Sequence, residues 1–167
     1  QAATSVRMGE HQVVIAGGME SMSNAPQLLM GQRNGKKMGD SKLIDSMIHD
    51  GLWDVYNNMH MGNTGEVVAK ECSIDRQQAD EFAAQSHIKA AKAWDEGWFD
   101  WETFPISIPQ RRGDPIVLSR DEGVRSDSTA EGLSKLRTVF DKDGIVTAGN
   151  ASTLNDGASA VLVTSEA

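Results

Sequence analysis

Apolar residues recur at helical spacing in five segments of the chain, and this pattern predicts one long helix and four short ones. The long helix is predicted to begin at Asp75-Arg-Gln-Gln78, which resembles a capping box, and to end at Gly97. Its expected apolar face consists of Ala79, Phe82, Ala83, Ala90, Ala93 and Trp94. The short helices are expected at residues 1–9, 41–52, 64–71 and 129–136.

Apolar runs bounded by glycine and proline predict strands between these helices. His11-Gln-Val-Val-Ile-Ala16 is rich in β-branched residues, and we expect a buried strand that breaks at Gly17-Gly18. Phe104–Pro109 alternates like a strand, and its prolines are typical of a sheet edge. Together with Pro115–Leu118 it predicts a hairpin. A last strand is expected at Val161-Leu-Val163.

A small, polar and glycine-rich stretch, Thr147–Ala160, leads into that last strand. It carries four polar side chains within seven residues: Asn150, Ser152, Asn155 and Asp156. Gly149 and Gly157 would permit unusual backbone angles and a close approach. One interpretation is a site that holds a polar ligand against a sheet. The other is an ordinary loop whose side chains bond to its own backbone. The stretch alone favours neither.

The composition favours a globular protein of one domain or slightly more. The 167 residues are 39% hydrophobic and 24% charged, which suits a chain with a packed core. A net charge of −8 argues against a nucleic-acid partner or an anionic membrane surface. The single cysteine, Cys72, excludes an internal disulfide and predicts the cytoplasm or another reducing intracellular compartment. No membrane-spanning segment is expected.

The residue pattern does not indicate a metal site or a covalently bound cofactor. The histidines are scattered (His11, His49, His60 and His87), and none forms a pair at ligand spacing. His87 lies on the long predicted helix, and we interpret it as a surface or packing residue. Cys72 stands beside Glu71, which disfavours a thiolate, so a structural role is expected. The methionines favour adaptable core packing over an acyl pocket.

Several motifs, in order along the chain, resemble those of the thiolase family. They are Val13-Val-Ile-Ala-Gly-Gly-Met-Glu-Ser-Met-Ser-Asn-Ala-Pro26, Lys37-Met-Gly-Asp40, Asn58-Met-His-Met-Gly62, Glu66-Val-Val-Ala-Lys70, Gln78-Ala-Asp-Glu-Phe-Ala83, Lys135-Leu-Arg137 with Phe140, and Ala148-Gly-Asn-Ala-Ser-Thr-Leu-Asn-Asp-Gly157. The family more often has alanine at Gly65 and glycine at Thr153. The motifs extend over essentially the whole chain, so the resemblance is specific although no single motif is.

The resemblance implies the α/β class, with a layered α/β/α core and an inserted α+β loop domain. Residues 1–23 and 155–167 would belong to the core, and residues 24–154 to the loop domain. The family forms homo-oligomers, so a dimer or tetramer is implied, with the loop at residues 31–39 contributing to subunit contact.

The resemblance also implies acyl transfer to and from coenzyme A, with formation or cleavage of 3-oxoacyl-CoA. In the family a cysteine thiolate, activated by a histidine, takes up the acyl group, and a second cysteine moves the α-carbon proton. None of these catalytic motifs occurs among the 167 residues, and Cys72 matches neither cysteine motif. The expected role is therefore to bind coenzyme A or acetyl-CoA as substrate, without turnover by this chain alone.

Eight residues are implied to contact the substrate. Ser152 would bond to the pantetheine arm, and Phe140, Ala148 and Leu154 would pack beside it. Arg125 would face the phosphates or the adenine, and Leu52 would lie near the nucleotide. His60 and Met61 would border the acyl pocket. His60 in His-Met-Gly resembles the short-chain, acetoacetyl-CoA type of thiolase; the other interpretation is a capping or packing histidine.

A second hypothesis is a thiolase-derived module that binds coenzyme A or a partner without chemistry. The adjoining coding sequence would separate the two hypotheses. An upstream cysteine codon with downstream Gly-His-Pro and Cys-x-Gly motifs would indicate an enzyme segment. Start and stop codons at these ends would indicate a module.

Overall fold

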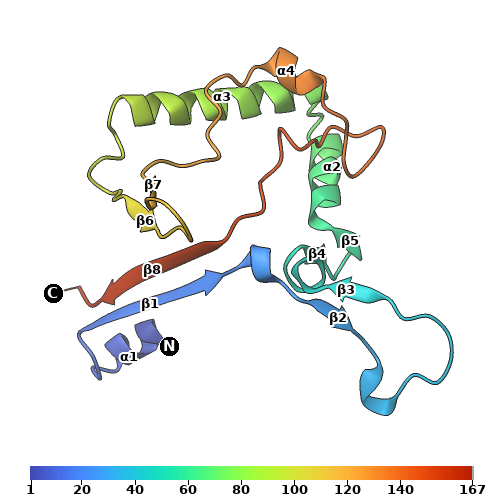
Figure 1. The fold of residues 1–167 in the computed structure, drawn as a ribbon, viewed down its shortest axis with the longest axis horizontal. Coiled ribbons are helices and arrows are strands. Elements are labelled where there is room, and N and C mark those ends of the chain that lie inside the picture. Colours follow the sequence, from blue (N-terminus) through green and yellow to red (C-terminus); the bar gives the residue numbers. More distant parts are fainter. Residues whose placement is uncertain (167) are drawn as a thin grey trace. The chain divides into compact units, whose positions relative to one another are not determined.

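A computed structural model describes residues 1–166. The chain divides into two compact units. The first contains residues 1–60 together with the C-terminal segment from Thr153, and the second contains Met61–Ser152. Residues 24–60 therefore fall in the same unit as the two long strands, β1 (Val13–Glu20) and β8 (Gly157–Thr164) (Figure 1). The division expected from the family, at residues 24 and 154, stays a prediction.

The first unit is built on an antiparallel pair of long strands, β1 (Val13–Glu20) and β8 (Gly157–Thr164), which Figure 1 draws side by side. The pairing runs from Val13 opposite Thr164 to Glu20 opposite Gly157. Helix α1 (Ala2–Arg7) packs against both strands, and Gly9 follows it with a φ of 75°. These elements confirm the predicted first helix and the two strands, which are longer than expected. The burial expected for the first strand is wrong in the described chain, because one strand partner and one short helix leave Val13 and Ile15 55% and 74% exposed.

The break predicted at Gly17-Gly18 is wrong, because β1 continues through both glycines. A β-carbon at Gly17 would collide with the backbone carbonyl oxygen of Ser159 on β8. Glycine at this position therefore lets the two strands approach closely. The residue that suggested a break is the one that permits the pairing.

Short elements complete the first unit. Two strand pairs, β2 (Gln27–Leu29) with β3 (Leu43–Asp45) and β4 (Trp53–Asp54) with β5 (Met59–His60), lie on either side of a π-helical turn at Met47–Gly51. Short 3-10 turns occupy Met22–Asn24 and Gln32–Asn34.

The helix predicted at residues 41–52 is therefore wrong. Leu43–Asp45 pairs with β2, and the carboxylate of Asp45 accepts hydrogen bonds from the backbone nitrogens of Met47 (2.9 Å) and Ile48 (3.4 Å). Pairing with a distant segment outweighs the local helical spacing here.

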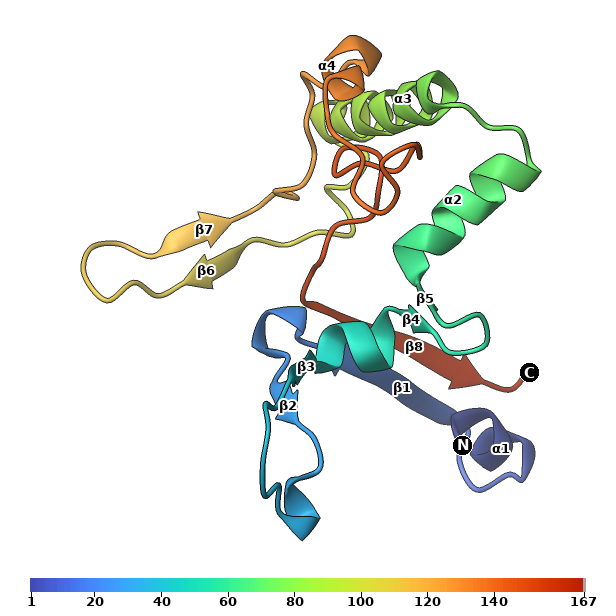
Figure 2. The same cartoon turned by 90° about the vertical axis from the view of Figure 1, so that its right-hand side faces the viewer.

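The second unit contains helices α2 (Met61–Glu71), α3 (Arg76–Asp95) and α4 (Ala130–Ser134), with the hairpin β6 (Ile106–Ile108) and β7 (Ile116–Leu118). Figure 2 shows α4 beside α3 and the hairpin extending away from both. The hairpin and the three helices confirm the predictions, although α2 begins three residues earlier than expected.

The predicted capping box of α3 is present. The Asp75 side chain accepts from the Gln78 backbone nitrogen at 2.8 Å, and the Gln78 side chain accepts from the Asp75 backbone nitrogen at 2.9 Å. Thr129, at the start of the expected short helix, caps α4 by accepting from the Gly132 nitrogen at 3.0 Å.

The predicted apolar face of α3 is confirmed at most positions, because Ala93 is buried and Ala79, Ala83, Ala90 and Trp94 are half-buried. Phe82, at 80% exposed, is the exception. The buried row also contains Asp80, which Ala84 and Ala91 follow at helical spacing. A buried carboxylate requires hydrogen-bond partners, because desolvation of an unpaired charge is costly. Asp80 has such partners in Arg76 and Asn150.

Candidate functional site

A loop at residues 138–150 carries two of the predicted substrate-binding residues, Phe140 and Ala148. Its two sides pair through an antiparallel bridge between Thr138 and Thr147, and the Val139 nitrogen donates to the Val146 carbonyl at 3.0 Å. A turn closes its end, where the Gly144 nitrogen donates to the Asp141 carbonyl at 3.1 Å. We call this segment the 138–150 loop.

Glu66 of α2 holds the returning side of the 138–150 loop. Its carboxylate oxygens accept from the backbone nitrogens of Ile145 (2.8 Å) and Val146 (2.9 Å). A β-carbon at Gly144 would overlap this carboxylate, so a residue without a side chain is needed there. Hydrogen bonds to an ionised acceptor are stronger than neutral ones, and these two attach the loop to α2.

Asn150 attaches the same loop to α3. Its amide nitrogen donates to Asp80 Oδ1 and to the Ile145 carbonyl, both at 2.9 Å, and its amide oxygen accepts from the Thr147 nitrogen at 2.8 Å. Thr147 is fully buried and Asp80 is 1% exposed. The side chain of Asn150 therefore organises the loop instead of facing a ligand.

Arg76 connects the same carboxylate to the end of α4. Its Nε donates to Asp80 Oδ2 at 2.7 Å, and its Nη2 donates to the carbonyls of Leu133 (2.8 Å) and Leu136 (2.9 Å). The backbone of Gly149 lies against the side chains of Leu133 and Leu136, where a β-carbon would not fit. The close approach expected at Gly149 is therefore confirmed.

The ring of Phe140 packs on the first turn of α2. A β-carbon at Gly62 would fall inside this ring, and the Asn63 side chain donates to the Phe140 carbonyl at 3.5 Å. Met61, the residue before Gly62, is half exposed. Phe140 and Met61, two of the predicted residues, thus lie at the same end of α2.

The eight predicted residues divide between the two units. Met61, Arg125, Phe140, Ala148 and Ser152 belong to the second, and Leu52, His60 and Leu154 to the first. Ser152 is exposed, and within residues 1–166 no hydrogen bond occupies its hydroxyl. Arg125 is also exposed, and its backbone nitrogen donates to His87 Nδ1 at 3.2 Å, so His87 has the packing role expected of it.

The other polar side chains of the glycine-rich stretch make local or structural bonds. Asn155 donates to the carbonyl of Thr153 at 3.0 Å and to its hydroxyl at 2.7 Å. Asp156 accepts from the Ser23 nitrogen at 2.9 Å, and this bond holds the pKa of Asp156 below its usual range. The close approach expected at Gly157 is wrong, because the space around that residue is open. The stretch is a structural loop at most positions, with Ser152 as the exception.

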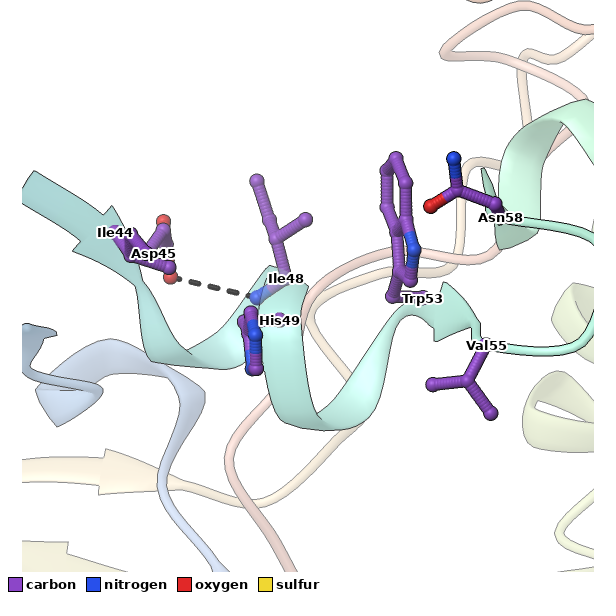
Figure 3. A pocket seen from close by; sticks show the side chains of 7 residues that line it. All are labelled: Ile44, Asp45, Ile48, His49, Trp53, Val55 and Asn58. Carbon is purple, nitrogen blue, oxygen red and sulfur yellow. Dashed lines mark hydrogen bonds between the residues drawn. The ribbon is translucent and has the colours of Figure 1, made fainter. Parts of the chain in front are cut away.

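Two hollows lie outside the residues that the sequence singled out. One, of about 440 Å³, is lined in the first unit by Ile44, Asp45, Ile48, His49, Trp53, Val55 and Asn58 (Figure 3). The other, of about 630 Å³, lies in the second unit between α2, α3 and Ile145-Val146. Neither is lined by any of the eight predicted residues. The walls of the second hollow come from segments far apart in sequence, so no local motif could have indicated it. The first is lined by residues 44–58 alone, where the expected helix did not form.

Residues 1–166 contain neither a candidate membrane span nor a candidate metal cluster. No helix in that range is both long and apolar enough to cross a membrane. No three side chains of His, Cys, Asp or Glu gather there as a metal site. Cys72, expected to be structural, is exposed just after α2.

The N-terminal-domain model of the thiolases matches residues 1–167, and the chain belongs to the thiolase family. Its sequence is 54% identical over 166 residues to an acetyl-CoA acetyltransferase of Cupriavidus necator, covering 99% of this chain and 42% of that protein. It is 52% identical over 162 residues to a probable acetyl-CoA acyltransferase of Staphylococcus aureus strain COL, with coverages of 97% and 41%. The chain therefore spans about two fifths of these relatives.

Solved structures agree with this assignment. The acetyl-CoA acetyltransferase from Syntrophomonas wolfei matches with a TM-score of 0.88 and 40% identity, covering 98% of this chain and 41% of that one. Human mitochondrial 3-ketoacyl-CoA thiolase in complex with CoA matches with a TM-score of 0.86 and 40% identity, covering 98% and 40%. The described chain is thus a mixed α/β segment of the thiolase fold, which confirms the fold class at that level.

Proposed function

We propose that this chain is the part of an acetyl-CoA C-acetyltransferase that binds coenzyme A and its acyl thioesters. The complete enzyme would make or cleave acetoacetyl-CoA through an acyl-cysteine, with its catalytic cysteines and histidine outside these 167 residues. One observation carries the proposal. Phe140 lies in the 138–150 loop, which is braced by α2 and α3, and Ser152, with an exposed hydroxyl, follows that loop by two residues.

The chemistry of these side chains suits the parts of coenzyme A. The pantetheine arm combines amides with short apolar links, so one hydroxyl beside an aromatic ring would bind it. In this proposal Ser152 bonds to an amide of the arm, while Phe140, Ala148 and Leu154 pack along it. Arg125 supplies a cation for the phosphates or the adenine. The complex of human mitochondrial 3-ketoacyl-CoA thiolase with CoA, at 40% identity, supports the ligand class.

The remaining residues would define the acyl end of the substrate. His60 and Met61 would border a small acyl pocket, and Leu52 would lie near the nucleotide. We further propose that residues 24–154 form the loop domain between two parts of the layered core, and that the complete protein is a homodimer or homotetramer. A reducing intracellular compartment remains the expected location.

Calorimetric titration of coenzyme A into the chain tests the binding role. We expect saturable binding, and Ser152→Ala should weaken it by about 0.5–1.5 kcal/mol, the usual net value of one hydrogen bond. Ser119→Ala is the matched control, because Ser119 is an exposed serine of the same unit outside the proposed site. Unchanged affinity in Ser152→Ala would remove Ser152 from the site.

The same preparation should show no thiolysis of acetoacetyl-CoA, because the nucleophile and its activating histidine are absent from this chain. Thiolysis at a rate comparable to that of a complete thiolase would contradict this division of roles.

A further inference from the structure

Asp80 occupies an unusual position for a charged residue. It lies within α3, is 1% exposed, and is one of two polar residues that are buried in the described part of the chain. A carboxylate in such a place is destabilising unless both oxygens are paired. Both are: Oδ2 accepts from Arg76 at 2.7 Å and Oδ1 accepts from Asn150 at 2.9 Å.

These two partners hold opposite ends of the segment that carries the proposed pantetheine site. Arg76 bonds to the carbonyls of Leu133 and Leu136, which precede Phe140. Asn150 bonds to the backbone of Ile145 and Thr147 and stands two residues before Ser152. The Asp80 carboxylate therefore fixes both the segment that enters the 138–150 loop and the segment that leaves it.

The geometry requires a carboxylate. Arg76 and Asn150 both present N–H donors, so their shared partner must accept on both oxygens. Asparagine has nearly the same shape, but its amide nitrogen would face one of the two donors. Asp80→Asn would then release one end of the loop while it preserves the volume of the side chain.

We propose that Asp80 is a positioning residue for the pantetheine arm of coenzyme A. It holds Phe140 and Ser152 at the spacing that the arm requires, without touching the ligand itself. This inference rests on the proposed function, since it assigns a task to a residue that supports the same site.

Two measurements on the 167-residue chain test the role of Asp80. They are calorimetric titration with coenzyme A, and amide hydrogen exchange followed by mass spectrometry. For Asp80→Asn we expect about a tenfold loss of affinity. We also expect faster exchange at residues 133–140 and 147–152, with exchange in α2 unchanged. Arg76→Lys is a second, milder variant, because lysine keeps the charge but cannot reach Asp80 and two carbonyls together. It should loosen residues 133–140 and weaken binding in the same direction.

Two matched controls separate positioning from a general loss of stability. Asp95→Asn makes the same substitution on α3 at a carboxylate that also pairs with an arginine, Arg120, but is 66% exposed. It should leave binding within about twofold. Ala93→Gly destabilises the C-terminal half of α3, away from Arg76 and Asp80, because glycine is a poor helix former, and it should also leave the affinity of the folded chain unchanged.

The outcomes distinguish this inference from the proposed function. Wild-type chain that does not bind coenzyme A would overturn both. Wild-type binding that Asp80→Asn leaves within about twofold would overturn the role of Asp80 alone. An equal loss of affinity in Ala93→Gly would also overturn it, because the effect of Asp80 would then be one of stability.

Discussion

At the scale of single residues, small side chains make room for the 138–150 loop. Gly62, Gly144 and Gly149 each lie where a β-carbon would overlap a neighbour: the Phe140 ring, the Glu66 carboxylate and the leucines in and just after α4, respectively. None of the three has a positive φ, so steric room and not backbone angle explains the glycine. Gly62 matters most for the proposed site, because it contacts Phe140.

Gly62→Ala should destabilise the chain by about 1–2 kcal/mol. Overpacking against Phe140 costs about 1–3 kcal/mol, and the higher helix propensity of alanine returns up to about 1 kcal/mol. Urea denaturation followed by circular dichroism measures the change. Gly65→Ala is the control on the same helix, where the new methyl group would meet only Val146 Cγ2 at 3.3 Å. Equal effects of the two substitutions would argue against the packing of Phe140 on Gly62.

At the scale of elements, α3 is the scaffold of the second unit. Its capping box, its length and its end at Gly97 all follow from local sequence, and all three were predicted. Its N-terminal half carries Arg76 and Asp80, and its C-terminal half carries Asp95, which pairs with Arg120 at 2.9 Å. Loss of order in α3 would therefore affect both the loop and the segment after β7.

Asp75→Ala should lower the stability of the second unit by about 1 kcal/mol, because it removes the side-chain acceptor of the capping box. Thermal unfolding monitored at 222 nm, a helix signal, would report the loss. Asp75→Ser keeps a capping oxygen and should cost clearly less. If both variants unfold at the same temperature, the box does not contribute measurably.

At the scale of the whole molecule, the first unit is held together by pairing between residues far apart in sequence. β1 pairs with β8, and the bond from the Ser23 nitrogen to Asp156 joins the two segments just beyond the pair. The Ser23 N–H group stabilises the ionised carboxylate, so the pKa of Asp156 is lower in the folded chain than its usual value near 3.8.

The stability of the first unit should therefore depend on pH in the acid range. A lowered folded-state pKa means that the unfolded chain binds a proton more readily. The contribution of Asp156 is present above its unfolded pKa and is lost as pH falls through the folded one. Wild-type chain should be more stable than Asp156→Asn at pH 7, with the difference shrinking below about pH 4. Urea denaturation across this range measures it.

Asp40→Asn is a suitable control for this titration, because Asp40 is an exposed aspartate of the same unit. It removes the same charge from the unit without removing the bond to the Ser23 nitrogen. A constant difference between the wild type and Asp156→Asn from pH 7 to pH 3 would contradict the bond to Ser23.

Sequence alone determined the features whose causes are local. The cap of α3 and the hairpin β6–β7 depend on neighbouring residues, and these predictions were confirmed. The thiolase motifs, read in order along the chain, were confirmed by the family match. Tertiary structure decided the rest. Residues 43–45 became a strand because β2 lies beside them, and Asp80 became buried because Arg76 and Asn150 satisfy it. The physical reason is the same in both cases: hydrogen bonding to another segment, 14 positions away from Leu29 to Leu43 and 70 from Asp80 to Asn150, outweighs the pattern of the neighbouring residues.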